Sequence, residues 1–150
     1  MIVYRITTAK WAGKLSGSGY PGRWNSKGKF IIYTASTRAL ACLENLVHRS
    51  GEGLNHIFKI TEIQIPDDCT AKAITMDGLP SLWFKMENTV HCRRIGDNWI
   101  EQKKHLLLHV PSSIIPDEYN VLINPAHPEF EKVSVHAIRD FSFDERLKMT

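Results

Sequence analysis

Short apolar segments, separated by turn-forming residues, limit the folds open to this chain more than any other feature. Most have the length and composition of buried strands, and one alternates apolar and polar residues as a strand with one solvated face does. The segments are Ile2–Ile6, Phe30–Tyr33, Phe58–Ile65, Leu106–Val110, Tyr119–Ile123 and the alternating Val133, Val135 and Ala137. Helices do not alternate regularly with these strands, which disfavours a doubly wound parallel sheet. We therefore expect an α+β domain with a mixed or mostly antiparallel sheet and few helices.

One stretch has clear helical periodicity. Ser36 or Thr37 can accept a hydrogen bond from a free backbone N–H at its start, and Gly51 is expected to end it. Its apolar stripe consists of Leu40, Leu43 and Val47, widened by Ala39 and Leu46. From about residue 67 to 104 the sequence predicts little, except that Asp97 could cap a short helix carrying Trp99.

The composition indicates one domain, residues 1–150, with one hydrophobic core. No window approaches the roughly 18 uninterrupted apolar residues that a membrane span needs. The first residues lack a secretory pattern, so we expect a cytoplasmic protein without a membrane partner. The net charge of +3 permits binding of an anionic small molecule or a nucleic acid but requires neither.

The cysteines and histidines give no sign of a structural metal or a disulfide framework. There are three cysteines, none in a CxxC pair, and the histidines form no HExxH motif. Cys42 lies in the apolar helical stretch and is interpreted as a small core residue. We expect no metal site and no metal-dependent catalysis.

Residues 16–28 form a loop that could bind an anion. Four glycines and one proline fall within these thirteen residues, together with Arg23, Asn25 and Lys27. The planar guanidinium of arginine suits phosphate oxygens, and glycines let backbone N–H groups approach an anion. The segment is neither GxGxxG nor a Walker A loop, so an ordinary turn with an exposed arginine is equally compatible with the pattern.

Three further residues have both a structural and a functional interpretation. Glu44 lies about 40° from Leu40 around the helix axis, so it borders the apolar stripe. It is either a surface glutamate or a carboxylate in a cleft. Tyr33 is either a core aromatic or a ring on which a flat base stacks. Ser112 either closes a turn or donates a hydrogen bond into a cleft.

Seven fragments occur in an order that resembles the RES domain family, named for an arginine, a glutamate and a serine. The resemblance extends from about residue 3 to residue 147. The fragments are Tyr4–Ile6, Gly22–Asn25 with Gly28, Ile32–Ala35, Ala39–Glu44, Val110–Ser112, Asn120–Pro128 and Phe141–Leu147. Each is weak alone, and their order makes the resemblance specific.

The resemblance implies a fold similar to ADP-ribosyltransferases, with a split, mostly antiparallel sheet around an NAD⁺ cleft. It implies a toxin of a type II toxin–antitoxin system that depletes NAD⁺ by breaking the nicotinamide–ribose bond, as a glycohydrolase or a phosphorylase. NAD⁺ is then a substrate, and no cofactor is expected. The implied partner is an Xre-type helix-turn-helix antitoxin that covers the cleft near Arg23. The resemblance also allows a homodimer, and direct DNA binding by this chain is not expected.

The resemblance also assigns site residues. The family's arginine, tyrosine, glutamate and serine correspond to Arg23, Tyr33, Glu44 and Ser112, and Arg5 matches a further NAD⁺-binding position. We expect the Glu44 carboxylate to stabilise positive charge on the ribose as the bond breaks, and Arg23 and Glu44 to converge on one cavity.

The remaining roles follow from the same hypothesis. Arg23 would pair with the diphosphate, with Asn25 as a weaker helper. Tyr33 would stack on the nicotinamide, and Ser112 would position the ligand. The acceptor stays open among water, phosphate and a macromolecule. A protein ADP-ribosyltransferase would use the same pocket. The sequence is also compatible with a ribonuclease toxin and with a non-catalytic module that binds a nucleotide.

Overall fold

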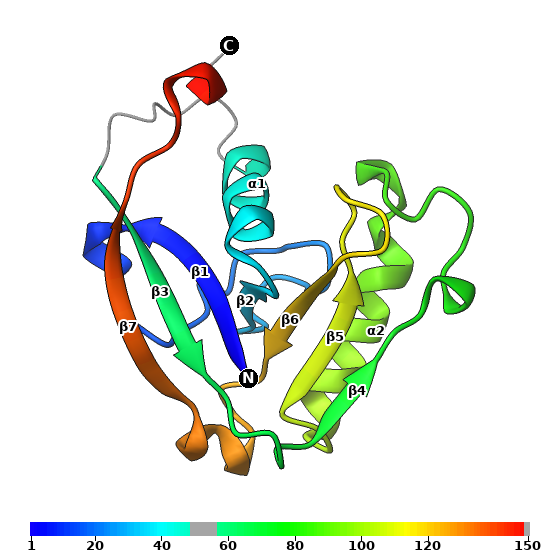
Figure 1. Ribbon diagram of the computed structural model, residues 1–150. Helices are drawn as coiled ribbons and strands as arrows, with labels where there is room; N and C mark the ends of the chain where they lie inside the picture. Colours follow the sequence, from blue (N-terminus) through cyan, green and yellow to red (C-terminus); the bar gives the residue numbers. More distant parts are fainter. Residues whose placement is uncertain (49–56, 149–150) are drawn as a thin grey trace.

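The computed structural model describes residues 1–48 and 57–148 and has a seven-stranded sheet of order β4-β5-β6-β2-β1-β3-β7 (Figure 1). The strands are β1 (Ile2–Thr8), β2 (Ile32–Ala35), β3 (Phe58–Gln64), β4 (Ala71–Ala73), β5 (Leu107–Pro111), β6 (Tyr119–Ile123) and β7 (Ser134–Phe141). Every neighbouring pair is antiparallel except β4 and β5, which are parallel. The described residues include two α-helices, α1 (Arg38–His48) and α2 (Thr89–Gln102). The expected α+β class, mostly antiparallel with few helices, is confirmed.

The sheet opens between β1 and β2. Strand β1 pairs with β3 from Ile2 to Thr8, but it meets β2 through the single registered pair Tyr4 and Ala35. The two halves, β1-β3-β7 and β2-β6-β5-β4, therefore diverge, and α1 lies where they separate (Figure 1). This is the split that the resemblance implied.

The second strand lies two residues later than the sequence predicts. Phe30 is 54% exposed, and the ladder with β6 begins only where Ile32 faces Ile123. Ile31 is buried, but it packs against the cluster around Trp24 instead of entering the strand. The apolar run therefore identified a buried segment without fixing its hydrogen-bonding register.

Helix α1 begins as predicted. The Thr37 hydroxyl accepts a hydrogen bond from the Leu40 N–H at 3.1 Å. The predicted stripe is too wide: Leu40 and Ala41 are buried, whereas Ala39 is exposed and Val47 is 59% exposed. The contacts of the helix with the sheet are concentrated on β1 and β2 beside the split, so the sheet covers only part of its surface. The predicted end at Gly51 lies outside the described residues.

Replacing Thr37 by alanine should lower the free energy of unfolding by about 1 kcal/mol, because a free helix N–H loses its acceptor. Chemical denaturation followed by circular dichroism measures this difference. Ser36→Ala, one residue earlier, is the matched control and should have a smaller effect. Equal losses for both variants would contradict the assignment of Thr37 as the cap.

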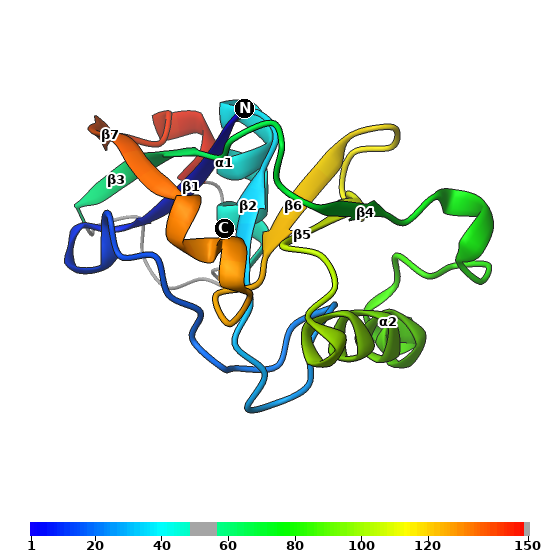
Figure 2. The same cartoon turned by 90° about the horizontal axis from the view of Figure 1, so that it is seen from below.

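Helix α2 corrects the prediction for the middle of the chain. Asp97 does not cap a short helix but lies within a helix of 14 residues, where its carboxylate accepts hydrogen bonds from the Ser26 N–H at 2.9 Å and the Ser26 hydroxyl at 2.5 Å. Trp99 does lie on this helix and is buried. Seen from below, α2 lies beside the loop between β1 and β2 (Figure 2). Asp97 therefore ties that loop to α2.

Three apolar clusters stabilise the domain. The first lies around Ile32 and Ile63, the second joins α2 to the sheet through Trp24, Trp83 and Trp99, and the third lies behind α1. Cys42 packs half-buried against the third cluster. Short 3₁₀ helices complete the described chain: η1 (Ala9–Trp11), η2 (Met76–Gly78), η3 (Met86–Asn88), η4 (Pro128–Lys132) and η5 (Glu145–Lys148). No helix among the described residues has the length and apolarity that crossing a bilayer would require.

Candidate active site in the split of the sheet

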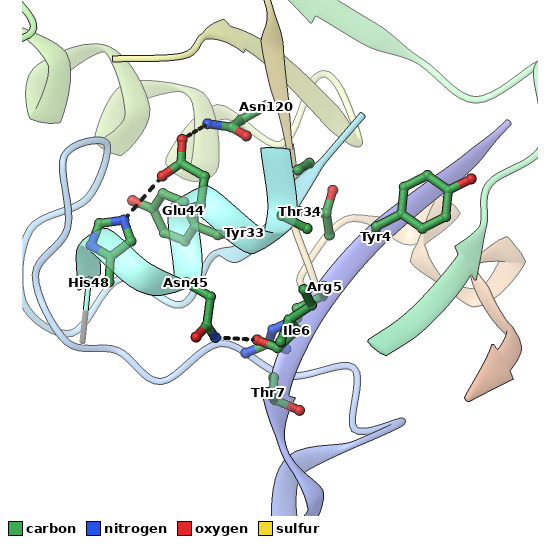
Figure 3. A pocket seen from close by; sticks show the side chains of 12 residues that line it. Tyr4, Arg5, Ile6, Thr7, Tyr33, Thr34, Glu44, Asn45, His48 and Asn120 are labelled. Atoms are coloured by element: carbon green, nitrogen blue, oxygen red, sulfur yellow. Dashed lines mark hydrogen bonds and ion pairs between the residues drawn. The ribbon is translucent and has the colours of Figure 1, made fainter. Parts of the chain in front are cut away.

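A pocket of about 310 Å³ lies where the sheet opens, between β1, β2, β6 and α1 (Figure 3). Its lining residues are Tyr4, Arg5, Ile6, Thr7, Tyr33, Thr34, Ala35, Ala41, Glu44, Asn45, His48 and Asn120. The lining combines a carboxylate, a guanidinium and several amides and hydroxyls with the apolar floor of the sheet. Such a mixture suits a polar ligand that carries a flat ring.

Glu44 reaches this pocket from α1 and is held by three neighbours. Its Oε1 accepts a hydrogen bond from Asn120 Nδ2 at 2.7 Å and a long contact of 3.5 Å from the Ser112 hydroxyl. Its Oε2 lies 3.3 Å from His48 Nε2, one turn further along the helix. Burial acts to raise the pKa of Glu44, but the hydrogen bonds from His48 and Asn120 outweigh it, and the net pKa is lowered. The carboxylate is therefore charged at neutral pH and fixed in orientation.

Ser112 contacts the Glu44 carboxylate from outside the pocket lining. It is buried, and its oxygen also accepts hydrogen bonds from the Ile114 and Ile115 N–H groups at 3.1 Å each. Ser112 is not among the residues that line the pocket. The structure thus joins the predicted serine to the predicted glutamate, while the serine closes a turn at the same time.

Tyr33 presents its ring to the pocket and anchors its hydroxyl in the loop behind. The hydroxyl donates to Asn25 Oδ1 at 2.6 Å and accepts from the Trp24 N–H at 3.2 Å. Burial raises the pKa of Tyr33, so the phenol stays neutral. Asn25 is 1% exposed and donates to the carbonyls of Tyr20, Ser26 and Lys29. Asn25 therefore supports Tyr33 and does not line the pocket.

Arg5 brings positive charge to the β1 side of the pocket. Its Nη1 donates to the carbonyls of Lys14 and Ser16 at 3.3 and 3.0 Å. Burial lowers its pKa. Within residues 1–48 and 57–148 no carboxylate forms an ion pair with Arg5. A partly buried guanidinium without a protein counter-ion is well suited to an anionic ligand group.

Arg23 does not share the pocket lining with Glu44, so the expected convergence on this cavity is not observed. Its guanidinium donates to the carbonyls of Trp83 and Phe84 at 2.8 Å each, and to that of Lys85 at 3.4 Å. It also lies 5.7 Å from the centre of the Trp83 ring. Burial lowers the pKa of Arg23, and nearby groups that include Glu44 oppose this change. Arg23 is thus near the carboxylate, but here it fastens residues 83–85 to the glycine-rich loop.

The sequence matches the model of the RES domain over residues 2–145. The chain belongs to the RES domain family. The match covers the split sheet, both helices and the residues that line the pocket.

Relatives of this RES domain span almost the same length. It is 40% identical over 141 residues to the "Prs ADP-ribosylating toxin" of Sphingobium sp. (strain YBL2), covering 91% of this chain and 88% of that protein. It is 36% identical to "Toxin Res" of Photorhabdus laumondii (98% and 97% covered) and to "Toxin Res" of Yersinia enterocolitica (99% and 100% covered). The fold is similar to a chain of the M. tuberculosis MbcT–MbcA toxin–antitoxin complex, with a TM-score of 0.76, 18% identity and coverage of 94% and 84%.

Sequence reasoning missed the two pocket residues that hold the Glu44 carboxylate, His48 and Asn120. His48 could have been found, because it follows Glu44 by four residues and so shares its helix face. Asn120 had only a weak signal, a polar residue near the start of an apolar strand. Its contact with Glu44 joins positions 76 apart in the sequence, so no local pattern could have revealed it.

Histidine spacing includes one HxxxH sequence, formed by His105 and His109. His109 lies on β5 and His105 precedes that strand, so the pair does not share a helix face. In the part of the chain that the structure describes, no group of three or more histidine, cysteine, aspartate or glutamate side chains could hold a metal ion.

Proposed function

We propose that this RES domain is the toxin of a toxin–antitoxin system and that it depletes NAD⁺ by breaking the nicotinamide–ribose bond. The observation that carries the proposal is the charged Glu44 carboxylate, fixed in a pocket that is also lined by the cationic Arg5. The names of the relatives, two of them "Toxin Res" and one an ADP-ribosylating toxin, support the toxin role and NAD⁺ as the substrate.

The proposed chemistry uses the two charged groups differently. As the bond to nicotinamide breaks, positive charge grows on the ribose, and a carboxylate already oriented beside it lowers the barrier. Glu44 fills this role, and Ser112 and Asn120 keep it aligned. Nicotinamide leaves as a neutral molecule, so a strong general acid is not needed. Arg5 pairs with the diphosphate, and the Tyr33 ring stacks on the nicotinamide.

Arg23 has a second role in this proposal. Its guanidinium holds the carbonyls of residues 83–85, and it would have to give up these hydrogen bonds to reach the diphosphate. Arg5 also donates to two backbone carbonyls, but it lines the pocket together with Glu44 and Arg23 does not. We therefore assign the main diphosphate contact to Arg5 and assign Arg23 to the support of the cleft beside Trp83.

A second candidate is transfer of ADP-ribose to a protein. The relative with 40% identity is named as an ADP-ribosylating toxin, and transfer would use the same pocket and the same carboxylate. The two reactions differ in the acceptor, which is water or phosphate in one case and a protein side chain in the other. The residues that surround Glu44 serve both reactions equally.

A ribonuclease function has less support. Glu44 and His48 form a pair that could transfer a proton. A ribonuclease also needs a basic groove for the RNA backbone. Among the described residues, Arg5 is the only arginine or lysine that lines the pocket.

Incubation of the purified protein with NAD⁺ should release nicotinamide, measured by chromatography. Parallel reactions with and without inorganic phosphate distinguish phosphorolysis from hydrolysis by the product formed. A third reaction contains NAD⁺ labelled in the adenosine part and a cell extract, and a labelled protein band would indicate transfer. A folded protein that neither releases nicotinamide nor labels a protein would refute the proposal.

The partner follows from the same proposal. We infer a helix-turn-helix antitoxin of the Xre type that blocks the cleft. The structural neighbour, described as a toxin–antitoxin complex, supports an antitoxin partner, and the Xre type follows from the family resemblance. Co-expression with the candidate antitoxin from the neighbouring gene should abolish nicotinamide release, and the toxin and the antitoxin should copurify. Full activity in such a complex would contradict the inference.

A further inference from the structure

Two residues that line the pocket each carry a buried polar atom without a hydrogen-bond partner. Among the described residues, three buried side-chain atoms have no hydrogen-bond partner: Thr7 Oγ1, Trp83 Nε1 and Asn120 Oδ1. Thr7 and Asn120 both line the pocket. A buried polar atom without a partner costs about 1–3 kcal/mol, so such atoms are rare unless something outside the chain satisfies them. Two such atoms, on residues that line the same pocket, point to a ligand that supplies the missing hydrogen bonds once it is seated against these side chains.

The chemistry of Asn120 determines what its free atom can bind. A carboxylate can only accept hydrogen bonds, so the amide group that faces Glu44 must be the NH₂. The amide oxygen is then the unpaired end, and it can only accept. The ligand group that meets Asn120 must therefore be a donor, such as a hydroxyl.

The backbone holds this side chain rigidly. Asn120 lies inside the sheet, facing Ala35 on β2 and Val110 on β5. Sites built on such strands keep their geometry better than sites on loops. Its amide therefore presents a fixed acceptor immediately beside the Glu44 carboxylate (Figure 3).

We propose that Asn120 is a specificity residue that positions Glu44 through its NH₂ group and accepts a hydrogen bond from a hydroxyl of the nicotinamide ribose through Oδ1. The inference rests on the proposed function and extends it to recognition of the sugar. Two adjacent acceptors, a carboxylate and an amide oxygen, match the two neighbouring hydroxyls of ribose. Because a pocket that binds a hydroxyl discriminates against its absence, Asn120 selects a ribose over a deoxyribose.

The test compares NAD⁺ with analogues that lack the 2′- or the 3′-hydroxyl of the nicotinamide ribose. For each protein, kcat/KM is measured for all three substrates, and kcat/KM for NAD⁺ is divided by kcat/KM for each analogue. These ratios are then compared between proteins, because the intrinsic reactivity of an analogue cancels in that comparison. In Asn120→Ala, the preference for NAD⁺ over at least one analogue should fall by roughly tenfold relative to wild type, the scale of one hydrogen bond. Asn98→Ala, which alters an exposed asparagine on α2, should leave every ratio unchanged.

Asn120→Asp separates the two roles. An aspartate keeps an acceptor in the place of Oδ1 but loses the donor and sets a like charge beside Glu44. The Asn120→Asp variant should keep the wild-type preference for NAD⁺ over the deoxy analogues, while its kcat falls by roughly tenfold or more. Asn98→Asp is the matched control for charge, and circular dichroism verifies that each variant folds.

If the kcat/KM ratios of Asn120→Ala equal those of wild type for both analogues, Asn120 does not recognise a ribose hydroxyl. Unchanged kcat in Asn120→Asp would overturn the positioning role, and this variant still tests the inference if Asn120→Ala does not fold. Either failure in a protein whose wild type releases nicotinamide removes only this inference. A folded wild type that does not act on NAD⁺ removes the proposed function itself.

Discussion

Glu44→Gln should release nicotinamide roughly 10²–10³ times more slowly than wild type, the scale expected when one fixed electrostatic stabiliser is lost. Glutamine has nearly the same shape, so the helix and the contacts around it should persist. What disappears is the negative charge that Asn120, Ser112 and His48 hold in the pocket. Chromatographic measurement of nicotinamide at saturating NAD⁺ gives kcat directly.

Glu145→Gln is the matched control for this change, because Glu145 is exposed on η5 in the last turn of the described chain. It should retain wild-type turnover. A folded Glu44→Gln protein with turnover within a few-fold of wild type would refute the role of this carboxylate, whatever reaction the pocket performs.

The same carboxylate predicts the pH dependence. Burial acts to raise the pKa of Glu44, but the hydrogen bonds to His48 and Asn120 lower it overall. A lowered pKa keeps the charged form present as pH falls, and activity is lost only when pH passes below that pKa. Turnover should therefore not decline through protonation of Glu44 between pH 7 and about pH 5. His48→Gln weakens the stabilisation and should move the acid limb of the profile to higher pH.

Gly96→Ala should destabilise the protein by about 3 kcal/mol, the upper part of the range for overpacking a close-packed interface. A Cβ at Gly96 would lie 1.7 Å from the Trp24 carbonyl oxygen and 2.7 Å from its carbon. Both atoms are backbone, so either α2 or the glycine-rich loop must move. A loss of stability is the opposite of the usual effect, since replacing glycine by alanine inside a helix normally raises the free energy of unfolding by about 1 kcal/mol.

Urea denaturation measures this loss, and Gly78→Ala is the control because nothing lies within 4 Å of a Cβ at that position. The displaced loop includes the Trp24 N–H and Asn25, which hold the Tyr33 hydroxyl. Nicotinamide release should therefore fall together with stability in Gly96→Ala. A variant as stable as wild type would show that α2 does not pack on Trp24 as described.

Helix α2 shows why sequence patterns alone were insufficient in the middle of the chain. Its buried face does repeat at helical spacing, but the repeating residues are small or polar as often as they are large and apolar. They are Thr89, Cys92, Gly96, Trp99 and Ile100. Gly96 is needed because the backbone at Trp24 passes directly over it. In a sequence, however, a glycine is usually a sign that a helix ends.

The sequence by itself determined the α+β class, most strand locations, a helix start capped by Ser36 or Thr37, and the family, because these depend on residues a few positions apart or on ordered fragments. Tertiary structure alone decided the register of β2, the carbonyl contacts of Arg23 and the pairing of Glu44 with Asn120. Those features join residues 60 to 76 positions apart or depend on which strands are neighbours. Strand order sets such contacts, and no local pattern of side chains encodes it.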